Sequence, residues 1–288
     1  MNLRIKQSLS YFYLIFFFLG RNSVSKIHAT AIVEKEVELG KDVEIGAYSV
    51  VRGNVRIGDR CVIMDHATIY GNLVMGNDNI VHPGAVLGNM PQDVSYKGEP
   101  TWVIIGDNNT LREYVTINRA STKCERKTII GNNNLIMAYS HIAHDCVIGN
   151  NNLMPNGSML SGHVTIGDHV HTGGLTGVHQ FVTIGSYSFI GFSSRIIKDV
   201  PPYIIVEGNP TEPRTINQIG LQRNGFSEDD ISLLKRAFKV LYVSKMLFPQ
   251  KIKALTAPPF SNNAHVQNLT NFVIASAQGS DGRAMGKK

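Results

Sequence analysis

The sequence predicts a mainly β protein: a left-handed parallel β-helix of hexapeptide repeats, with about nine or ten coils, followed by a small C-terminal α-helical domain. An aliphatic residue followed by glycine recurs at multiples of six over residues 40–106, and again over 131–191. This repeat ends at Pro201-Pro202, and apolar residues at helical spacing follow Ser227. Three hexads form one triangular coil of 18 residues, and successive coils stack about 4.8 Å apart as parallel strands.

The composition is typical of a globular chain. Of 288 residues, 43% are hydrophobic and 17% are charged, which excludes a disordered or collagen-like protein. The net charge of +6 is concentrated at the N-terminus, because four basic residues precede the first acidic residue, Glu34. Beyond residue 33 the chain has 24 basic and 22 acidic residues. A basic surface that binds nucleic acid is therefore not predicted.

Residues 1–25 form a leader or extension that we place outside the fold. Its apolar run YFYLIFFFLG is too short for a spanning helix, so no stable membrane span is predicted. Three interpretations stay open for it: an export signal, a mitochondrial or other organellar presequence, and an extension from an upstream start codon. The three cysteines form no CxxC pair, and an odd number cannot complete a disulfide set. We therefore expect a cytoplasmic protein, or an organellar one if residues 1–25 are a presequence.

Residues 26–202 are predicted to form the β-helix. A hexad with one inward aliphatic residue and a neighbouring Gly, Asn or Asp makes a short strand and a corner, because those residues tolerate positive φ. The GNNN segments at 131–134 and 149–152 are such corners. The second glycine series is one residue out of phase with the first, which indicates a short insertion between residues 106 and 131. A β-sandwich gives no reason for an 18-residue register over this length.

Residues 203–278 are predicted to be a linker and a helical domain that caps the open end of the coil. Ser227 is an expected N-cap, and the acidic and apolar residues after it predict a helix of about twenty residues that ends before Pro249. A second helix is expected over residues 264–275. Residues 279–288 are expected to be a disordered tail.

Four of the ten histidines are predicted to gather at one corner of the β-helix. On the 18-residue period they come from three successive coils and are His141, His144, His163 and His179. Gly162 and Gln180 lie 18 and 36 residues after His144 and should stack directly above it. His169 and His171 fall on another side and are expected to be surface residues.

His144 and Asp145 are candidates for acyl-transfer catalysis. A neutral imidazole beside a carboxylate is a general base tuned near physiological pH, and Gly162 can present a backbone N–H to a developing oxyanion. Asp145 has a second interpretation, because aspartate is also common at tight corners. Two other functions stay open: a zinc-dependent, carbonic-anhydrase-like protein with a tri-histidine site, and a purely structural β-helix.

Six segments of the chain carry the motifs of one enzyme family. They are QDVSYKGEPT at 92–101, HIAHDC at 141–146, SGHVTIG at 161–167, GVHQF at 177–181, KDVPPYIIVEGNP at 198–210 and GLQRNGFS at 220–227. They resemble the UDP-N-acetylglucosamine 3-O-acyltransferase family, which begins lipid A biosynthesis. The resemblance covers about residues 27–275. It implies a homotrimer that transfers a 3-hydroxyacyl chain from acyl carrier protein to the 3-hydroxyl of UDP-N-acetylglucosamine (UDP-GlcNAc), with the thioester as co-substrate and with no cofactor or metal.

The resemblance also implies a role for each residue of the predicted site. His144 would be the base that takes the proton from the sugar 3-hydroxyl, Asp145 would orient it, and Gly162 would supply the oxyanion N–H. Phe192 would limit the acyl chain to about ten carbons, because glycine at this place in the family's pattern leaves room for a longer tail. The residues implied to bind the substrate are His141, His163, His179, Gln180, Gln92, Asp93, Asn217 and Arg223.

Two basic residues of the family pattern are absent here. Ser95 stands where the family has a Lys before the Tyr of this segment, and it offers no cation to a phosphate. Lys97 would face the same way as Ser95 if the segment is extended, so Lys97 is a candidate substitute. Asn224 stands beside Arg223 where many members carry a second basic residue. The acceptor is therefore left open between UDP-GlcNAc and a 3-amino sugar nucleotide.

Overall fold

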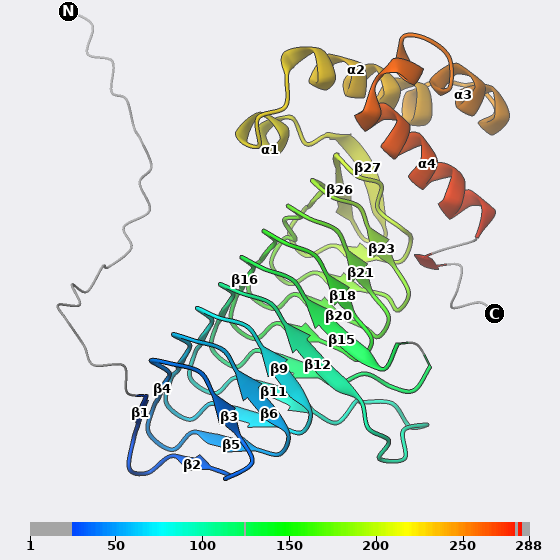
Figure 1. Cartoon of the computed structure of the whole chain (residues 1–288). Coiled ribbons are helices and arrows are strands. Elements are labelled where there is room, and N and C mark those ends of the chain that lie inside the picture. Colours follow the sequence, from blue (N-terminus) through cyan, green and yellow to red (C-terminus); the bar gives the residue numbers. More distant parts are fainter. Residues whose placement is uncertain (1–24, 124, 280–281, 284–288) are drawn as a thin grey trace, which may run out of the picture.

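The computed structural model of the chain describes residues 25–123, 125–279 and 282–283. Over these residues the chain folds into the predicted left-handed parallel β-helix, a prism with three sheets as its faces and with helices at its C-terminal end (Figure 1). The predicted leader lies outside the described residues, except for Ser25. Among the described helices, none is both long enough and apolar enough to cross a bilayer.

Each coil contributes strands to three parallel sheets, named A, B and C here. Sheet A contains β1 (Lys26–Ile27), β4 (Glu44–Ile45), β7 (Val62–Ile63), β10 (Ile80–Val81), β13 (Thr110–Leu111), β16 (Leu135–Ile136) and β19 (Leu153–Met154). Sheet B contains β2 (Ile32–Val33), β5 (Val50–Arg52), β8 (Thr68–Tyr70), β11 (Val86–Asn89), β14 (Thr116–Asn118), β17 (His141–Ile142), β20 (Met159–Leu160), β22 (Gly177–Val178) and β25 (Arg195–Ile196). Sheet C contains β3 (Glu38–Leu39), β6 (Val55–Ile57), β9 (Leu73–Met75), β12 (Trp102–Ile105), β15 (Lys127–Ile130), β18 (Val147–Ile148), β21 (Thr165–Ile166) and β23 (Thr183–Ile184). The nine strands of sheet B, counted over the described residues, agree with the predicted number of coils.

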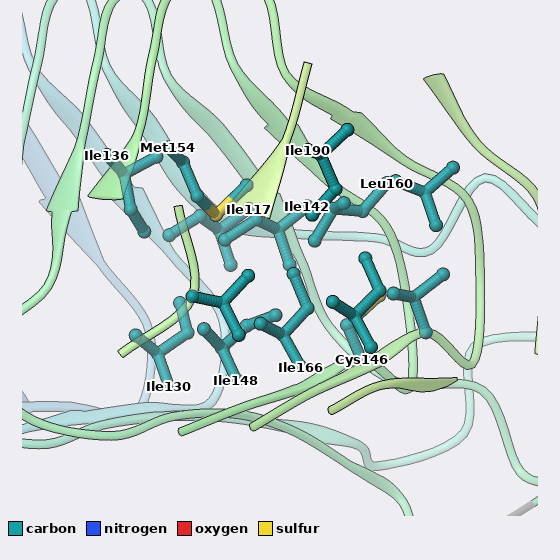
Figure 2. Packing of buried hydrophobic residues seen from close by; sticks show 14 of the residues in the cluster. Ile117, Ile130, Ile136, Ile142, Cys146, Ile148, Met154, Leu160, Ile166 and Ile190 are labelled. Carbon is teal, nitrogen blue, oxygen red and sulfur yellow. The ribbon is translucent and has the colours of Figure 1, made fainter. Parts of the chain in front are cut away.

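The interior of the prism is filled by aliphatic side chains that recur every six residues. Ile142, Ile148, Met154, Leu160 and Ile166 are each at most 2% exposed (Figure 2). Backbone pairing holds the coils at a separation of 18 residues, as between Ile142 and Leu160. The hexad pattern predicts this core correctly, because each inward side chain packs on its equivalent one coil away.

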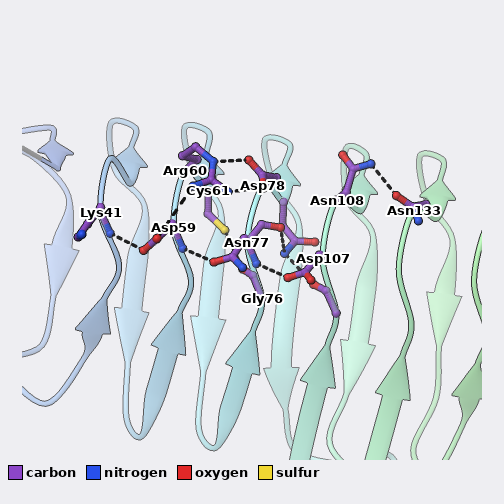
Figure 3. Close-up of polar contacts among 12 residues, drawn as sticks. Lys41, Asp59, Arg60, Cys61, Gly76, Asn77, Asp78, Asp107, Asn108 and Asn133 are labelled. Atoms are coloured by element: carbon purple, nitrogen blue, oxygen red, sulfur yellow. Dashed lines mark hydrogen bonds and ion pairs between the residues drawn. The ribbon is translucent and has the colours of Figure 1, made fainter. Parts of the chain in front are cut away.

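Polar side chains tie successive coils together at the corner between sheets C and A. The Oδ1 atom of Asp59 accepts the backbone N–H of Lys41 at 2.8 Å, and the Oδ1 atom of Asn77 accepts that of Asp59 at 2.8 Å (Figure 3). Inside the prism, the Oδ1 atom of buried Asn109 accepts the backbone N–H of Asn134 at 2.9 Å. These bonds satisfy backbone donors that the corners remove from the sheets, which explains the Asn and Asp residues of the repeat.

Corner residues adopt the left-handed backbone conformation, and not all of them are the Gly, Asn or Asp that the sequence predicts. The GNNN corners agree with the prediction, since Asn133 and Asn151 each have a φ of 57°. Tyr114 and Tyr139 also have positive φ, and their rings stack with centroids 5.2 Å apart. Stacking between coils helps to offset the conformational cost of about 1–2 kcal/mol per residue.

Two loops leave the coil within the described chain, and only one of them is predicted. Trp102 pairs with Lys127, 25 residues on instead of 18, which confirms the insertion between residues 106 and 131. Ile80 pairs with Thr110, 30 residues on, so a longer insertion precedes it. Its 12 extra residues are a multiple of six, so it leaves the glycine phase unchanged. We name these two the first insertion loop (residues 90–101) and the second insertion loop (residues 119–126).

The coil continues past the double proline. Pro201 and Pro202 lie at a corner, where the backbone needs no donor for a ladder. β24 (Phe189–Ile190) then pairs in parallel with β26 (Ile204–Gly208), and β27 (Thr211–Ile216) returns antiparallel to β26. The β-helix therefore extends beyond residue 202, where the sequence places its end.

The C-terminal helices gather at the end of the prism (Figure 1). Over the described residues they are α1 (Gln218–Arg223), α2 (Glu228–Phe238), a π-helix (Lys239–Val243), α3 (Phe248–Leu255), a 3-10 turn (Phe260–Asn262) and α4 (Ala264–Gln278). Ser227 caps α2 as predicted, because its Oγ accepts the N–H of Asp230 at 3.1 Å. The predicted length of twenty residues is wrong, since helical structure stops at Val243. Pro249 begins α3 instead of following a helix, because the first helical turn needs no N–H donor there.

Part of the predicted disordered tail is tied to the last coil. Of residues 279–288 the structure describes Gly279, Gly282 and Arg283. The backbone N–H of Arg283 donates to Asp199 Oδ1 at 2.9 Å. Disorder is therefore the wrong expectation for Gly282 and Arg283, whereas the other tail residues lie outside the described part of the chain.

Candidate active site

Three successive coils bring the predicted residues to the corner between sheets B and C. From coil to coil they are His144 and Asp145, Gly162 and His163, and His179 and Gln180. The backbone N–H of His163 donates to the carbonyl of His144 at 3.0 Å, and that of Phe181 to Gly162 at 3.1 Å. The stacking inferred from the 18-residue period is therefore confirmed.

His144 and Asp145 form a hydrogen-bonded pair at this corner. His144 Nδ1 lies 2.8 Å from Asp145 Oδ2, and the carboxylate is completely buried while the imidazole is 13% exposed. Asp145 Oδ2 also accepts the backbone N–H of Ser121 at 2.9 Å. Burial raises the pKa of the Asp145 carboxyl, but the hydrogen bonds from His144 and Ser121 outweigh it and hold that pKa below its ordinary value. The charged carboxylate can thus hold Nδ1–H of His144 and leave Nε2 as the basic nitrogen.

Both interpretations of Asp145 apply to it. Its backbone is left-handed, with a φ of 61°, so it does form the corner. Its backbone N–H is fixed by Thr128 Oγ1 at 2.9 Å. The same turn directs the carboxylate at His144, so the corner geometry and the dyad depend on one residue.

Gly162 provides the space that the His144 ring occupies. A Cβ atom at residue 162 would lie 2.5 Å from His144 Cε1, so any larger residue would displace the imidazole. Within the described part of the chain, the Gly162 N–H enters no backbone hydrogen bond. It can therefore donate to a developing oxyanion.

The other predicted histidines line the same corner. The His163 ring stacks on Phe181 with centroids 4.4 Å apart, and its Nε2 lies 3.8 Å from Asp145 Oδ2. His141 Nδ1 lies 2.7 Å from Thr116 Oγ1. Burial lowers the pKa of both His163 and His141, which favours neutral imidazoles that can donate or accept hydrogen bonds.

His179 and Gln180 lie one coil beyond His163, at the solvent-facing end of this corner. His179 is half-buried, and its Nδ1 lies 3.3 Å from the Gln180 carbonyl. The Gln180 side chain is exposed. Both are therefore accessible to a substrate bound beside His144.

The first insertion loop places Asp93 near the corner and leaves Gln92 exposed. Ser95 donates to Asp93 Oδ1 from its N–H and its hydroxyl, each at 2.8 Å, so residues 93–95 form a turn. The segment is not extended, and the expectation that Lys97 replaces the family's lysine is wrong. Instead, Lys123 of the second insertion loop reaches Asp93, with Nζ 2.9 Å from Oδ2.

Sequence reasoning missed Ser121, Lys123 and Thr128 as parts of the site. Ser121 and Lys123 belong to the second insertion loop, and Thr128 follows directly after it. The 18-residue period cannot assign such residues to a corner. The only signal for them is the phase slip itself, which marks where a loop leaves the coil.

Asn217 and Arg223 lie on a different face of the same chain. They line a cavity of about 660 Å³ on sheet A, together with His171, Phe189 and Asn224. Asn217 is nearly buried and caps α1, since its Oδ1 accepts the N–H of Gly220 at 3.1 Å. Burial and the charge of Arg223 lower the pKa of His171. Within one chain, these residues are not brought together with His144.

Phe192 lies at the corner between sheets A and B, and its side chain is 67% exposed. A Cβ atom at Gly174 would lie 3.3 Å from Phe192 Cε2, so the ring stacks over Gly174 as expected. Met159 and Leu175 are also exposed on sheet B and at this corner. Together they give this side of sheet B an apolar surface.

One group among the described residues is close enough to hold a metal ion: His144, Asp145 and His163, whose ligand atoms lie within 4.8 Å. It has two histidines and not the three that the zinc alternative requires. His144 Nδ1 and Asp145 Oδ2 already bind each other in it. The geometry therefore fits a general-base dyad better than a tri-histidine centre.

Comparison with protein families gives two matches. A family described as "Udp N-acetylglucosamine O-acyltransferase; Domain 2" matches residues 199–280. The bacterial transferase hexapeptide repeat matches residues 54–89 and 127–162. The first covers the last coils and the helical domain, and the second covers the coils on both sides of the insertion loops.

Individual proteins extend this likeness over most of the chain. An acyl-[acyl-carrier-protein]–UDP-N-acetylglucosamine O-acyltransferase from Herminiimonas arsenicoxydans is 40% identical over 89% of this chain and 99% of its own. The structure of LpxA from Acinetobacter baumannii is 38% identical, covers 89% of this chain and 98% of its own, and has a TM-score of 0.84. The UDP-N-acetylglucosamine acyltransferase from Arabidopsis is 34% identical, with 87% and 96% coverage and a TM-score of 0.80. With this coil, this corner dyad and these relatives, the chain belongs to the UDP-N-acetylglucosamine O-acyltransferase family.

Proposed function

We propose that this chain transfers a 3-hydroxyacyl group from acyl carrier protein to the 3-hydroxyl of UDP-GlcNAc, the first step of lipid A biosynthesis. The single observation that carries the mechanism is the buried His144–Asp145 pair at the open corner of the coil. Its relatives bear the name of this reaction. The acyl carrier protein thioester serves as co-substrate, and the reaction uses no other cofactor.

His144 acts as general base. Because Nδ1 is held by Asp145, Nε2 takes the proton from the sugar hydroxyl, and the oxygen attacks the thioester carbonyl carbon. The Gly162 N–H donates to the oxyanion of the tetrahedral intermediate. The intermediate collapses with cleavage of the C–S bond, and the imidazolium returns its proton to the thiolate of the carrier.

One assay tests substrate, donor and bond type together. Purified protein is incubated with UDP-GlcNAc and a panel of 3-hydroxyacyl carrier proteins, and the products are weighed by mass spectrometry. The expected product loses its acyl chain in mild alkali, as an ester does. Turnover of only a 3-amino sugar nucleotide, with an alkali-stable product, would replace the proposed acceptor by the alternative one.

We also propose a trimer with active sites shared between subunits. In one chain the dyad lies at the corner of sheets B and C, whereas Asn217 and Arg223 line a cavity on sheet A. A convex corner cannot enclose a nucleotide and an acyl chain by itself, so a facing subunit must complete the cleft. The apolar surface with Met159 and Phe192 gives that cleft a wall for the chain.

Shared sites predict recovery of activity when two inactive variants are mixed. His144→Ala and Arg223→Ala each impair one half of the site, and mixed trimers rebuild some intact sites. We expect activity to rise well above that of either variant after co-refolding, and light scattering to give a trimer. A monomer that is fully active at assay concentration would refute the shared site.

Phe192→Gly should shift the preferred acyl chain to greater length. The wild type is expected to prefer about ten carbons over fourteen, with discrimination of about 1–3 kcal/mol per methylene beyond the limit. Removal of the ring opens the space over Gly174, while the KM for UDP-GlcNAc stays unchanged. Competition between donors of different length measures this, and an unchanged length profile would remove Phe192 from the role.

We further propose that the protein acts in a reducing compartment, the cytoplasm, or an organelle if residues 1–25 are a presequence. The thiols of Cys61 and Cys146 are free and buried, and burial raises the pKa of Cys146 to about 12. Such thiols need no oxidising environment. The N-terminal sequence of the mature protein and its cell fraction test this, and a secreted form cleaved after the leader would contradict it.

A further inference from the structure

The two insertion loops meet beside the dyad. Asn118, at the start of the second loop, donates from Nδ2 to the carbonyl of Met90 at 2.5 Å. Lys123 then reaches Asp93, with Nζ 2.9 Å from Oδ2. Between these two contacts, the N–H of Ser121 donates to Asp145 Oδ2. The second loop therefore connects the first loop to the catalytic corner.

Lys123 and Asp93 differ strongly in exposure. The Asp93 side chain is only 8% exposed, whereas that of Lys123 is 54% exposed. Hydrogen bonds from Lys123 and Ser95 hold the pKa of Asp93 well below its usual range, so the carboxylate is charged. An ammonium group has three N–H donors, and Asp93 occupies one of them. Asp93 thus anchors a cation that is still open to a ligand.

The position of this pair relates it to the substrate. The charges of Lys123 and Asp93 both act on the imidazole of His163, which stacks one coil above Asp145. A sugar 3-hydroxyl at His144 lies only the width of one ring from the anomeric phosphate of the same sugar. The diphosphate must therefore lie close to this corner, where a carboxylate alone would repel it.

We propose that Lys123 is a phosphate-binding cation of the sugar-nucleotide site, held by Asp93 through one N–H and paired with the diphosphate through the others. This inference rests on the proposed function and names a residue of the same site. Lysine suits the task, because its ammonium is a compact charge that binds phosphate without a fixed geometry.

Lys123→Met tests this proposal, because it keeps the length of the side chain and removes its charge. We expect the Kd and the KM for UDP-GlcNAc to rise about tenfold, with kcat within about twofold of wild type. The affinity for UDP, which lacks the sugar, should fall as well, and binding should depend less on salt. Calorimetry at two salt concentrations measures both, without any acyl donor.

Matched variants separate phosphate binding from a bracing role. Lys123→Arg keeps the charge and should retain most of the affinity, whereas Lys97→Met in the other loop should change nothing. Asp93→Asn should leave UDP binding intact or improve it, because a negative charge is lost. In the Asp93→Asn background, Lys123→Met should still cost about tenfold in UDP affinity.

Each outcome bears on one claim. A Lys123→Met variant that binds UDP as wild type does, with the same salt dependence, overturns the proposal. So does a double variant no weaker than Asp93→Asn, since Lys123 would then only brace Asp93. Failure of the wild type to bind UDP-GlcNAc would instead contradict the proposed function, and the role of Lys123 would fall with it.

Discussion

His144→Ala should reduce kcat by about 10²–10⁴-fold while the coil remains folded, because it removes only the general base. Asp145 keeps its hydrogen bond from the Ser121 N–H in the variant, so the buried carboxylate is not left without a donor. The aliphatic core lies inside the prism, away from this corner side chain. We therefore expect a melting temperature within a few degrees of wild type.

Two further variants make this result specific. His144→Gln can still donate a hydrogen bond to Asp145 but cannot act as a base, so it should be as inactive as His144→Ala. His169→Asn is the matched control, because His169 stacks on Tyr187 at another corner and asparagine occupies the equivalent position at residue 151. A His144→Ala enzyme with more than about a tenth of the wild-type rate would contradict the assignment of the base.

The fold could be predicted because the structural repeat is local. Each coil packs only on its neighbours, so the inward positions recur every six residues and stack every 18. The same logic hides the first insertion loop, whose length is a multiple of six. Periodicity reports phase, and an insertion that preserves phase leaves no trace in it.

The helical domain was harder to predict, because no period constrains it. Pro249 has two opposite meanings, as a breaker after a helix or as a favourable residue in the first turn of the next one. Only the tertiary structure decides between them, and it places Pro249 in the first turn of α3. The apolar run that predicts one long helix is divided among α2, a π-helix and α3.

The corner of the site could be predicted and its supporting shell could not. His144, Asp145 and Gly162 follow from the 18-residue period, since all three belong to the regular coils. Ser121 and Lys123 reach the corner from an insertion, and the period does not place them. Asn217 and Arg223 come only from the resemblance, and their position on sheet A shows why one chain's sequence cannot join them to the dyad.

Asp145→Asn should lower kcat by about 10²–10⁴-fold, through charge and not through shape. An asparagine oxygen can take the place of Oδ2 and keep the bonds to His144 and Ser121, but the charge that stabilises the imidazolium is lost. The amide NH₂ would then occupy the place of Oδ1, which is buried without a partner. An unpaired buried donor costs about 1–3 kcal/mol, so the variant should also melt at a lower temperature.

The loss of stability in Asp145→Asn should depend on pH in one direction. The folded pKa of Asp145 is below its ordinary value, so its contribution is complete above the unfolded pKa of about 3.9 and disappears as the pH falls through the folded value. The difference in melting temperature between wild type and variant should therefore be constant from about pH 5 to 8 and shrink below about pH 4. Asp168→Asn is the matched control, since Asp168 accepts the N–H of Asn150 in the corner ladder and asparagine holds the same position at residue 132. It should keep wild-type kcat, and an Asp145→Asn enzyme as active as this control would show that the carboxylate only forms the corner.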